Sequence, residues 1–137
     1  MRRRARAGAI QVLYAWDLAG RSTNPSLERY ADRVWTVLAV AKEERDVAQR
    51  ILSVVESRTE EIDSGIAAAT RNWRLGRLGA IERAVLRLGS AELMTGTTPP
   101  RVVIQESVTL AERFGTLESA RFVNGVLDAI ARQMGTL

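Results

Sequence analysis

The sequence predicts an all-α fold of six or seven short helices, and three observations support that prediction. Apolar residues recur three and four positions apart along nearly the whole chain, which is typical of amphipathic helices. No segment shows sustained alternation of apolar and polar residues, so we expect little or no sheet. With 137 residues, 46% hydrophobic and 26% charged, the chain has the size and composition of one globular domain. Within this single domain, 1–137, we expect two sub-bundles of about 1–72 and 73–137.

The first half of the chain predicts three helical segments. Residues 5–19 carry one apolar stripe. A loop then leads to a second helix, for which Asn24 is the expected N-cap and Pro25 the first helical residue. Residues 42–70 form a long third stretch with a candidate bend at Gly65.

The second half predicts a connector and three further helices. Residues 73–79 form the connector, and the helix that follows is stopped by Gly96 and Pro99–Pro100. The next helix is expected to end at Gly115 in a left-handed cap, and the last one begins near Thr116.

The net charge of +4 lies entirely in the first six residues, which include Arg2, Arg3, Arg4 and Arg6. No acid precedes Asp17, and basic and acidic residues balance from there on. Phosphate is the partner best suited to adjacent guanidiniums, because arginine binds it through two parallel hydrogen bonds. A solvated tail in an arginine-rich chain remains the alternative.

The same arginines are unfavourable for the helix that they precede. Cations near a helix N-terminus each cost about 0.3–1 kcal/mol. We therefore expect residues 2–6 to be unordered without a ligand.

Two residue types are missing, and their absence excludes much chemistry. The chain has no cysteine and no histidine, so it lacks thiol chemistry and the usual general base and zinc or haem ligands. Carboxylate clusters at 43–46 and 60–63 are expected on exposed helix faces. We expect no catalytic site, no metal site and no cofactor.

The chain has no apolar run long enough to span a membrane. Its arginine-rich start is similar to a mitochondrial transit peptide or a twin-arginine export signal. Residues 11–18 instead continue directly into core-like periodicity, so we expect a cytoplasmic protein.

Two aromatic residues follow the arginines. Tyr14 lies on the apolar stripe, so it is suited equally to the core and to stacking on an unpaired base. Trp16 favours the core. In the last helix, Asn124–Gly125 would cost about 1–2 kcal/mol relative to alanines, and close helix packing at Gly125 is the favoured explanation.

Several segments resemble, in order, the NusB family of transcription antitermination factors. They are Arg2–Arg6 with Gln11, Leu13–Tyr14 and Trp16; Ile62–Asp63, Trp73 and Arg77–Leu78; Glu82–Arg87 and Glu92–Leu93; Val103–Val108 and Ala111–Gly115; and Phe122–Asp128. The resemblance covers nearly the whole chain, and the last segment is its most specific part. The chain departs from the family pattern at Gly8, which is expected to loosen the arginine-bearing turn, and at Ser90–Ala91, which lacks a large aromatic side chain.

The resemblance implies an all-helical fold of two three-helix bundles without enzymatic activity. It further implies binding to the single-stranded boxA element of ribosomal RNA leader transcripts, together with the ribosomal protein NusE. The pair would act on the transcription elongation complex, where it promotes read-through by RNA polymerase. By position, the resemblance implies RNA contacts at Arg2, Arg3, Arg4, Arg6, Tyr14, Arg87, Glu118 and Phe122. It implies partner contacts at Glu82 and Arg83.

Other functions remain open at this point. Ribosomal RNA 5-methylcytosine methyltransferases carry a NusB-like RNA-binding domain, and this chain could be such a domain. A protein-only helical interaction module is a further alternative, in which the arginines bind an acidic partner. A homodimer that covers the arginines is also open.

Overall fold

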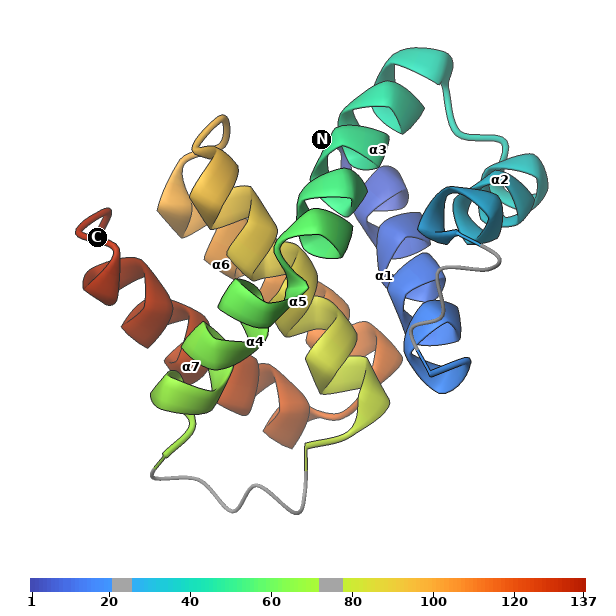
Figure 1. The fold of residues 1–137 in the computed structure, drawn as a ribbon. Helices are drawn as coiled ribbons and strands as arrows, with labels where there is room; N and C mark the ends of the chain where they lie inside the picture. The colour runs from blue at the N-terminus through green and yellow to red at the C-terminus, as the bar shows by residue number, and fades with distance from the viewer. Residues whose placement is uncertain (21–25, 72–77) are drawn as a thin grey trace.

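The computed structural model describes residues 1–20, 26–71 and 78–137, and within them the chain is entirely helical. The helices are α1 (Arg3–Leu18), α2 (Leu27–Leu38), α3 (Lys42–Ser57), α4 (Thr59–Ala69), α5 (Ala80–Thr95), α6 (Pro100–Phe114) and α7 (Leu117–Gln133) (Figure 1). The predicted all-α fold is confirmed. None of these helices is long and apolar enough to cross a membrane.

Helix α5 is the centre of the arrangement. It packs against α1 and α3 on one side and against α4, α6 and α7 on the other (Figure 1). Helices α1, α2 and α3 contact one another, and α6 pairs with α7. Helix α4 packs on α5 and α7, and it also contacts α3.

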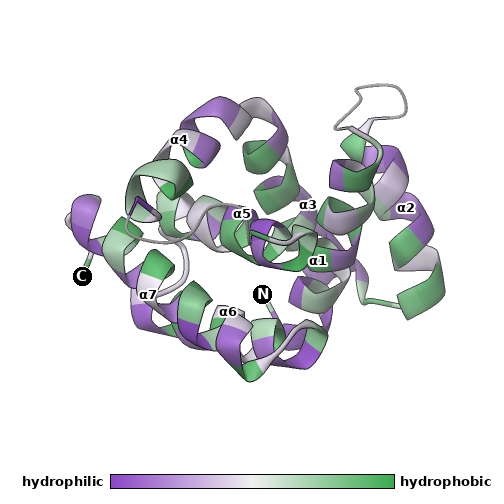
Figure 2. Cartoon of the chain, turned by 90° about the horizontal axis from the view of Figure 1, so that it is seen from below, coloured by the Kyte–Doolittle hydropathy of each residue, from purple (hydrophilic) through white to green (hydrophobic). Residues whose placement is uncertain are grey.

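One hydrophobic core runs through both groups of helices. Figure 2 shows the hydrophobic sides of the helices turned inward and the hydrophilic sides outward. The largest fully buried side chains come from both groups and include Ile10, Leu13, Leu27, Leu52, Leu86, Leu110 and Leu127. The groups are therefore joined by shared burial of apolar surface, which is the main favourable contribution to folding.

The break in the predicted 42–70 stretch lies at Arg58 rather than at Gly65. Arg58 leaves the helical region with φ −122° and ψ 28°, and its guanidinium pairs with Glu61 in the first turn of α4. Gly65 lies inside α4, so glycine did not mark the bend.

Two other boundary predictions involve residues that the structure does not describe. The predicted cap at Asn24 and Pro25 lies outside the described residues, and α2 begins at Leu27 after Ser26. Most of the predicted connector, residues 73–77, is likewise outside them.

Gly8 and Gly115 differ from expectation for the same reason, which is close packing. A Cβ atom on Gly8 would lie 2.5 Å from the Trp35 ring, so glycine lets α1 approach α2 rather than loosening α1. Gly115 has φ −121° and is not in a left-handed cap. A Cβ atom there would lie 2.8 Å from Ser119 Oγ, which belongs to the cap of the next helix.

Candidate RNA-binding surface

The first turn of α1 exposes three of the four N-terminal arginines, Arg2, Arg3 and Arg4. Arg3 Nε lies 2.9 Å from Glu106 Oε2 on α6, and the Arg3 side chain remains 54% exposed. Arg4 donates to the Leu38 carbonyl at the end of α2, 2.6 Å away. Since these contacts are at the surface, the guanidiniums stay within reach of an external phosphate.

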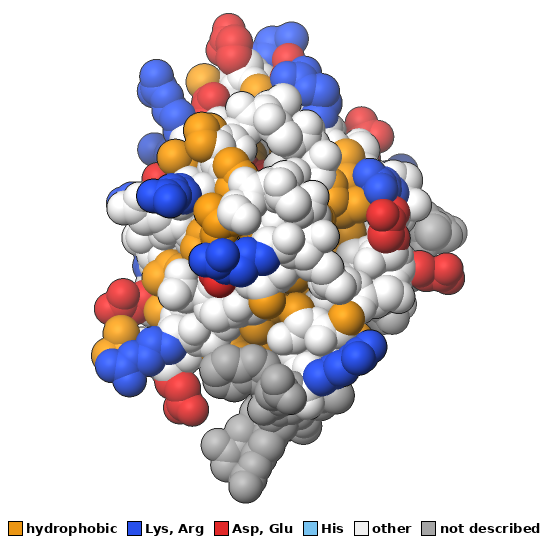
Figure 3. Space-filling model, turned by 90° about the vertical axis from the view of Figure 1, so that its left-hand side faces the viewer, with side chains coloured by type: hydrophobic (Ala, Val, Ile, Leu, Met, Phe, Trp, Pro, Cys, Tyr) orange, Lys and Arg blue, Asp and Glu red, His pale blue; other side chains and the backbone are white. Residues whose placement is uncertain are grey.

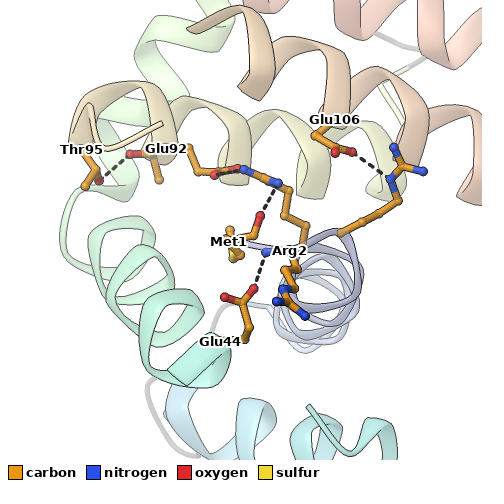
Figure 4. Close-up of polar contacts among 9 residues, drawn as sticks. Met1, Arg2, Glu44, Glu92, Thr95 and Glu106 are labelled. Atoms are coloured by element: carbon orange, nitrogen blue, oxygen red, sulfur yellow. Dashed lines mark hydrogen bonds and ion pairs between the residues drawn. The ribbon is translucent and has the colours of Figure 1, made fainter. Parts of the chain in front are cut away.

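Arg6, for which the resemblance implies an RNA contact, lies in a different environment, buried against α5. Its side chain is 4% exposed and binds Glu92 on α5 through two bonds, Nε to Oε2 at 3.0 Å and Nη2 to Oε1 at 2.9 Å (Figure 4). Its Nη1 donates to the Met1 carbonyl. Both charges are withdrawn from water and satisfy each other, so Arg6 is not available to RNA in this structure.

These contacts give the N-terminal segment defined partners, in contrast to the disorder expected from its charge. The backbone amide of Arg2 donates to Glu44 on α3 (Figure 4). Together with Glu92 and Glu106, this places acids from three helices around the start of α1. The acids offset the unfavourable interaction between the arginines and the positive end of the helix.

The start of α5 connects α1 to α7 through Glu82 and Arg83. Ser119 Oγ on α7 donates to Glu82 Oε1 at 2.8 Å. Arg83 Nε lies 2.9 Å from Asp17 Oδ2 on α1, and Arg83 also donates to the Leu78 carbonyl. These two neighbouring residues therefore bring the end of α1 and the start of α7 to the same end of α5.

Arg87, for which the resemblance also implies an RNA contact, is buried one turn further along α5. Its guanidinium binds both carboxylate oxygens of Asp63 on α4, at 2.9 and 3.1 Å. Its Nη1 lies 3.1 Å from Asp17 Oδ1, an ionic contact without the alignment of a full hydrogen bond. Arg87 thus ties α1 and α4 to α5 rather than facing RNA.

This network shifts the pKa values of Asp17 and Arg87 in opposite directions. Burial alone would raise the pKa of Asp17, but the polar and ionic contacts with Arg83 and Arg87 outweigh it and hold that pKa below its usual 3.8. Burial alone would lower the pKa of Arg87, but Asp63 and Asp17 raise it above its usual value. Both groups therefore stay charged at neutral pH.

The remaining predicted RNA contacts lie at the surface around that end of α5. Tyr14 is 37% exposed, which resolves its placement in favour of the surface, whereas Trp16 is 3% exposed and in the core as expected. Glu118 is exposed in the first turn of α7, and Phe122 is half-buried. Tyr14 precedes Asp17 by three positions and Phe122 follows Ser119 by three, so each adjoins a residue that α5 holds.

The structure also changes the explanation of Asn124–Gly125. Both residues are exposed on α7. Close helix packing therefore does not account for the glycine. The close approaches in which a glycine admits a neighbouring helix are at Gly8 and at Gly89, where a Cβ atom would lie 2.9 Å from Leu127.

Sequence reasoning missed the acids that hold the arginines. No sequence pattern assigns a partner to Asp17, Glu92 or Glu106, and Asp63 belongs to the 60–63 cluster that is expected on an exposed helix face. A signal was present for Glu92, because it interrupts the buried apolar run of α5. A pairwise contact such as Arg6 with Glu92, 86 positions apart, has no local pattern that reveals it.

The chemistry of this surface suits a nucleic acid with unpaired bases. It offers guanidiniums for phosphates at the start of α1 and the partly exposed Tyr14 ring for bases. Tyr14 lies eleven residues beyond Arg3, about 16 Å along the helix axis. In the described residues, no group of three or more His, Cys, Asp or Glu is placed to hold a metal ion.

Comparison with known proteins identifies the family. The family model described as the NusB family matches residues 3–132. The chain belongs to the NusB family. A relative named transcription antitermination protein NusB, from Solibacter usitatus, is 39% identical over 135 residues, which cover 97% of this chain and 90% of the relative.

Several solved structures have the same fold as this NusB-family chain. A chain from a crystal structure of antitermination factors NusB and NusE in complex with dsRNA has a TM-score of 0.84 and 32% identity, with 96% of both chains covered. A chain from a crystal structure of a plectonemic RNA supercoil has a TM-score of 0.87 and 34% identity, with 99% of both chains covered. NusB of T. maritima has a TM-score of 0.84 and 30% identity, over 97% of this chain and 92% of that one.

Proposed function

We propose that this chain is a transcription antitermination factor. It binds the single-stranded boxA element of ribosomal RNA leader transcripts together with ribosomal protein NusE, and it promotes read-through by RNA polymerase in the elongation complex. The observation that carries the proposal is the likeness to a NusB chain crystallised with NusE and RNA. The role is binding rather than catalysis, and it belongs in the cytoplasm, where transcription takes place.

The proposed mechanism begins with electrostatic capture. The exposed Arg2, Arg3 and Arg4 contact phosphates, and each neutralised phosphate releases counterions from the RNA. Tyr14 and Phe122 then stack on unpaired bases, a contact worth about 1–3 kcal/mol per base. The Glu118 carboxylate accepts hydrogen bonds from base amino groups.

The buried charges support this surface without touching the RNA. Arg6 fixes the first turn of α1 to α5, and Arg87 fixes the end of α1 through Asp17. Glu82 bonds to Ser119 on α7, near Phe122, and Arg83 pairs with Asp17 on α1, near Tyr14. The two residues therefore keep these parts of α1 and α7 close to the start of α5. Because both residues lie half-exposed next to the RNA surface, they are also the proposed contacts of NusE.

The other candidate functions are less well supported. The Solibacter usitatus relative named NusB is matched over 90% of its own length, which favours the antitermination factor over the methyltransferase-associated domain. A protein-only module remains an outcome of the experiment below.

The test is binding of a short labelled boxA RNA, with and without NusE, over a salt series. The variant Arg2→Ala/Arg3→Ala/Arg4→Ala is compared with Arg29→Ala/Arg33→Ala/Arg50→Ala, which removes the same charge from exposed positions on α2 and α3. We expect NusE to tighten binding by the native chain. The first variant should lose affinity and flatten the slope of log affinity against log salt by about 2, since each single-strand phosphate contact contributes about 0.7.

The control variant should keep the native slope. Equal losses in the two variants would show a general charge effect rather than an arginine site. If the native chain ignores RNA even with NusE present, the protein-only module replaces the proposal. Light scattering with and without RNA shows in addition whether a homodimer competes for the same surface.

A further inference from the structure

The helix that carries the exposed arginines begins without a cap or an acid of its own. Arg2 is the N-cap residue of α1, its side chain makes no capping hydrogen bond, and the first turn contains no Asp or Glu. The first amides of a helix have no partner inside it, so a start of this kind frays unless other groups hold it. By contrast, α7 begins with a complete capping box between Thr116 and Ser119.

The peptide group that joins Met1 to Arg2 is held from both sides. Its carbonyl, which belongs to Met1, accepts a hydrogen bond from Arg6 Nη1 at 2.5 Å. Its N–H, which belongs to Arg2, donates to Glu44 on α3 (Figure 4). Arg6 is itself bound to Glu92 on α5. The start of α1 is therefore fixed between α3 and α5 by an N-terminal clamp that consists of Arg6, Glu44 and Glu92.

The two acids of the N-terminal clamp differ in how far they belong to the interior. Glu92 is 2% exposed and balances the buried charge of Arg6, so the fold depends on it. Glu44 is half-buried in the first turn of α3, where its contact is with a backbone amide. Glu44 can therefore be replaced without leaving a buried charge unpaired.

By charge alone, an acid beside a phosphate-binding segment weakens the binding of RNA. The rest of the chain supplies no compensating excess of positive charge, because basic and acidic residues balance from Asp17 onward. Figure 3 shows one face of the molecule, the left-hand side of Figure 1, on which basic and acidic side chains are interspersed. RNA binding then depends on the few guanidiniums at the start of α1 and on the backbone that presents them.

We propose that Glu44 is a positioning residue for RNA binding. By accepting the Arg2 amide, it holds the first turn of α1 in one conformation before RNA arrives, and the three exposed arginines extend from that fixed turn. Backbone order that exists before binding does not have to be gained on binding, so it raises affinity. The inference rests on the proposed function and adds to it a role for an acid on α3, a helix that carries none of the expected RNA contacts.

The first arm of the test examines the N-terminal clamp without RNA. Glu43→Ala is the matched control for Glu44→Ala, because Glu43 is an exposed acid in the same turn of α3. Amide order parameters of residues 3–6 are measured by NMR relaxation on the full chain. We expect values of about 0.85 in the native chain and in Glu43→Ala, and below about 0.6 in Glu44→Ala.

The second arm measures the affinity for a short boxA RNA with NusE present. Glu44→Ala should bind about fivefold more weakly than the native chain although it has lost a negative charge, because the first turn of α1 is released. Glu43→Ala should bind at least as tightly as the native chain. Glu44→Gln keeps an acceptor oxygen without the charge, so its affinity should stay within about twofold of the native value.

A third arm separates positioning from general support of the fold. Added to Arg2→Ala/Arg3→Ala/Arg4→Ala, Glu44→Ala should change the residual affinity by less than about twofold, since no arginine remains to be positioned. Unchanged order parameters, a gain in affinity for Glu44→Ala, equal losses for Glu44→Ala and Glu44→Gln, or an additive loss in the triple variant would each overturn the proposal and leave the RNA-binding function standing. Failure of the native chain to bind RNA would overturn the proposed function, and this inference with it.

Discussion

The first turn of α1 and the interior next to α5 use arginine in opposite ways. Arg3 lies at the surface, 54% exposed, with one acid beside it. Arg6, less than one turn later, is 4% exposed and holds a buried carboxylate with two bonds. The comparison teaches that arginines one helical turn apart are distinguished by the helices that face them, because Arg3 meets Glu106 of α6 at the surface and Arg6 meets Glu92 of α5 in the interior.

The burial of Arg87 follows the same contrast between an interior and a surface position. Its neighbours on the core-facing side of α5, Ala84 and Ala91, are fully buried, and Arg87 shares their face. Its charge is balanced by Asp63 and Asp17 rather than by solvent. Arginine at a buried position supports the fold, and arginine at an exposed one is free to recruit an anion.

The largest expected effect is on stability and comes from the buried pair of Arg6 and Glu92. Arg6→Ala should lower the free energy of unfolding by about 3–5 kcal/mol, because it leaves Glu92 buried and uncompensated. Arg3→Ala should cost less than about 1 kcal/mol, since it breaks an exposed pair. Urea denaturation followed by circular dichroism measures both.

A double replacement sharpens this result. Arg6→Met with Glu92→Leu should recover most of the lost stability, because apolar residues of similar volume avoid the cost of desolvating two charges. A smaller loss for Arg6→Ala than for Arg3→Ala would contradict the assignment of Arg6 to the interior.

The next effect is on the Asp17 network and depends on pH. Asp17→Asn should cost about 1.5–3 kcal/mol at neutral pH, because it replaces an ionised acceptor of two arginines. The folded-state pKa of Asp17 is lowered, so its stabilisation is complete above its unperturbed value of 3.8 and is lost as the pH falls through the lower folded value.

The stability difference between the native chain and Asp17→Asn should therefore shrink only below about pH 4. Asp32→Asn, at an exposed position on α2, is the control and should show little difference at any pH. A difference that already disappears at pH 6 would rule out ionised Asp17 as its source.

The smallest expected effect is on RNA affinity and concerns the exposed pair of Arg3 and Glu106. Glu106→Gln releases Arg3 from its partner and removes a negative charge near the proposed phosphate path. Given the modest strength of exposed pairs, we expect boxA affinity to rise about two- to fivefold.

Glu112→Gln, an exposed acid on the same helix, is the matched control in an RNA titration. It should change affinity less than Glu106→Gln does. Equal gains in the two variants would mean that only the net charge matters, and that Arg3 has no special position.

The helices could be predicted because their signals are local. Stripes of apolar residues, Gly96 and the Thr116 cap mark their elements within a few positions, and the structure follows them. The break at Arg58 could not be read in this way, because Gly65 is the stronger local signal and packing placed the bend elsewhere.

The candidate site was predicted only in part, for a physical reason. Arg2, Arg3, Arg4, Tyr14 and Glu118 are exposed, as a binding role requires. Arg6 follows the spacing of Ile10 and Leu13, which places it on the core stripe, whereas its charge favours the surface. The acids that face Arg6 and Arg87 come from distant helices, so only the tertiary arrangement reveals them.

The close approach of α1 to α2 at Gly8 also determines how the protein can be observed. Trp35 lies against Gly8, and Trp16 is buried on the same helix as Gly8, while Trp73 is outside the described residues. Among the described helices, the intrinsic ultraviolet emission of indole therefore arises from the α1–α3 group. An emission transition that coincides with the circular dichroism transition would show that the two groups of helices unfold together, and one that precedes it would show that α1 and α2 separate first.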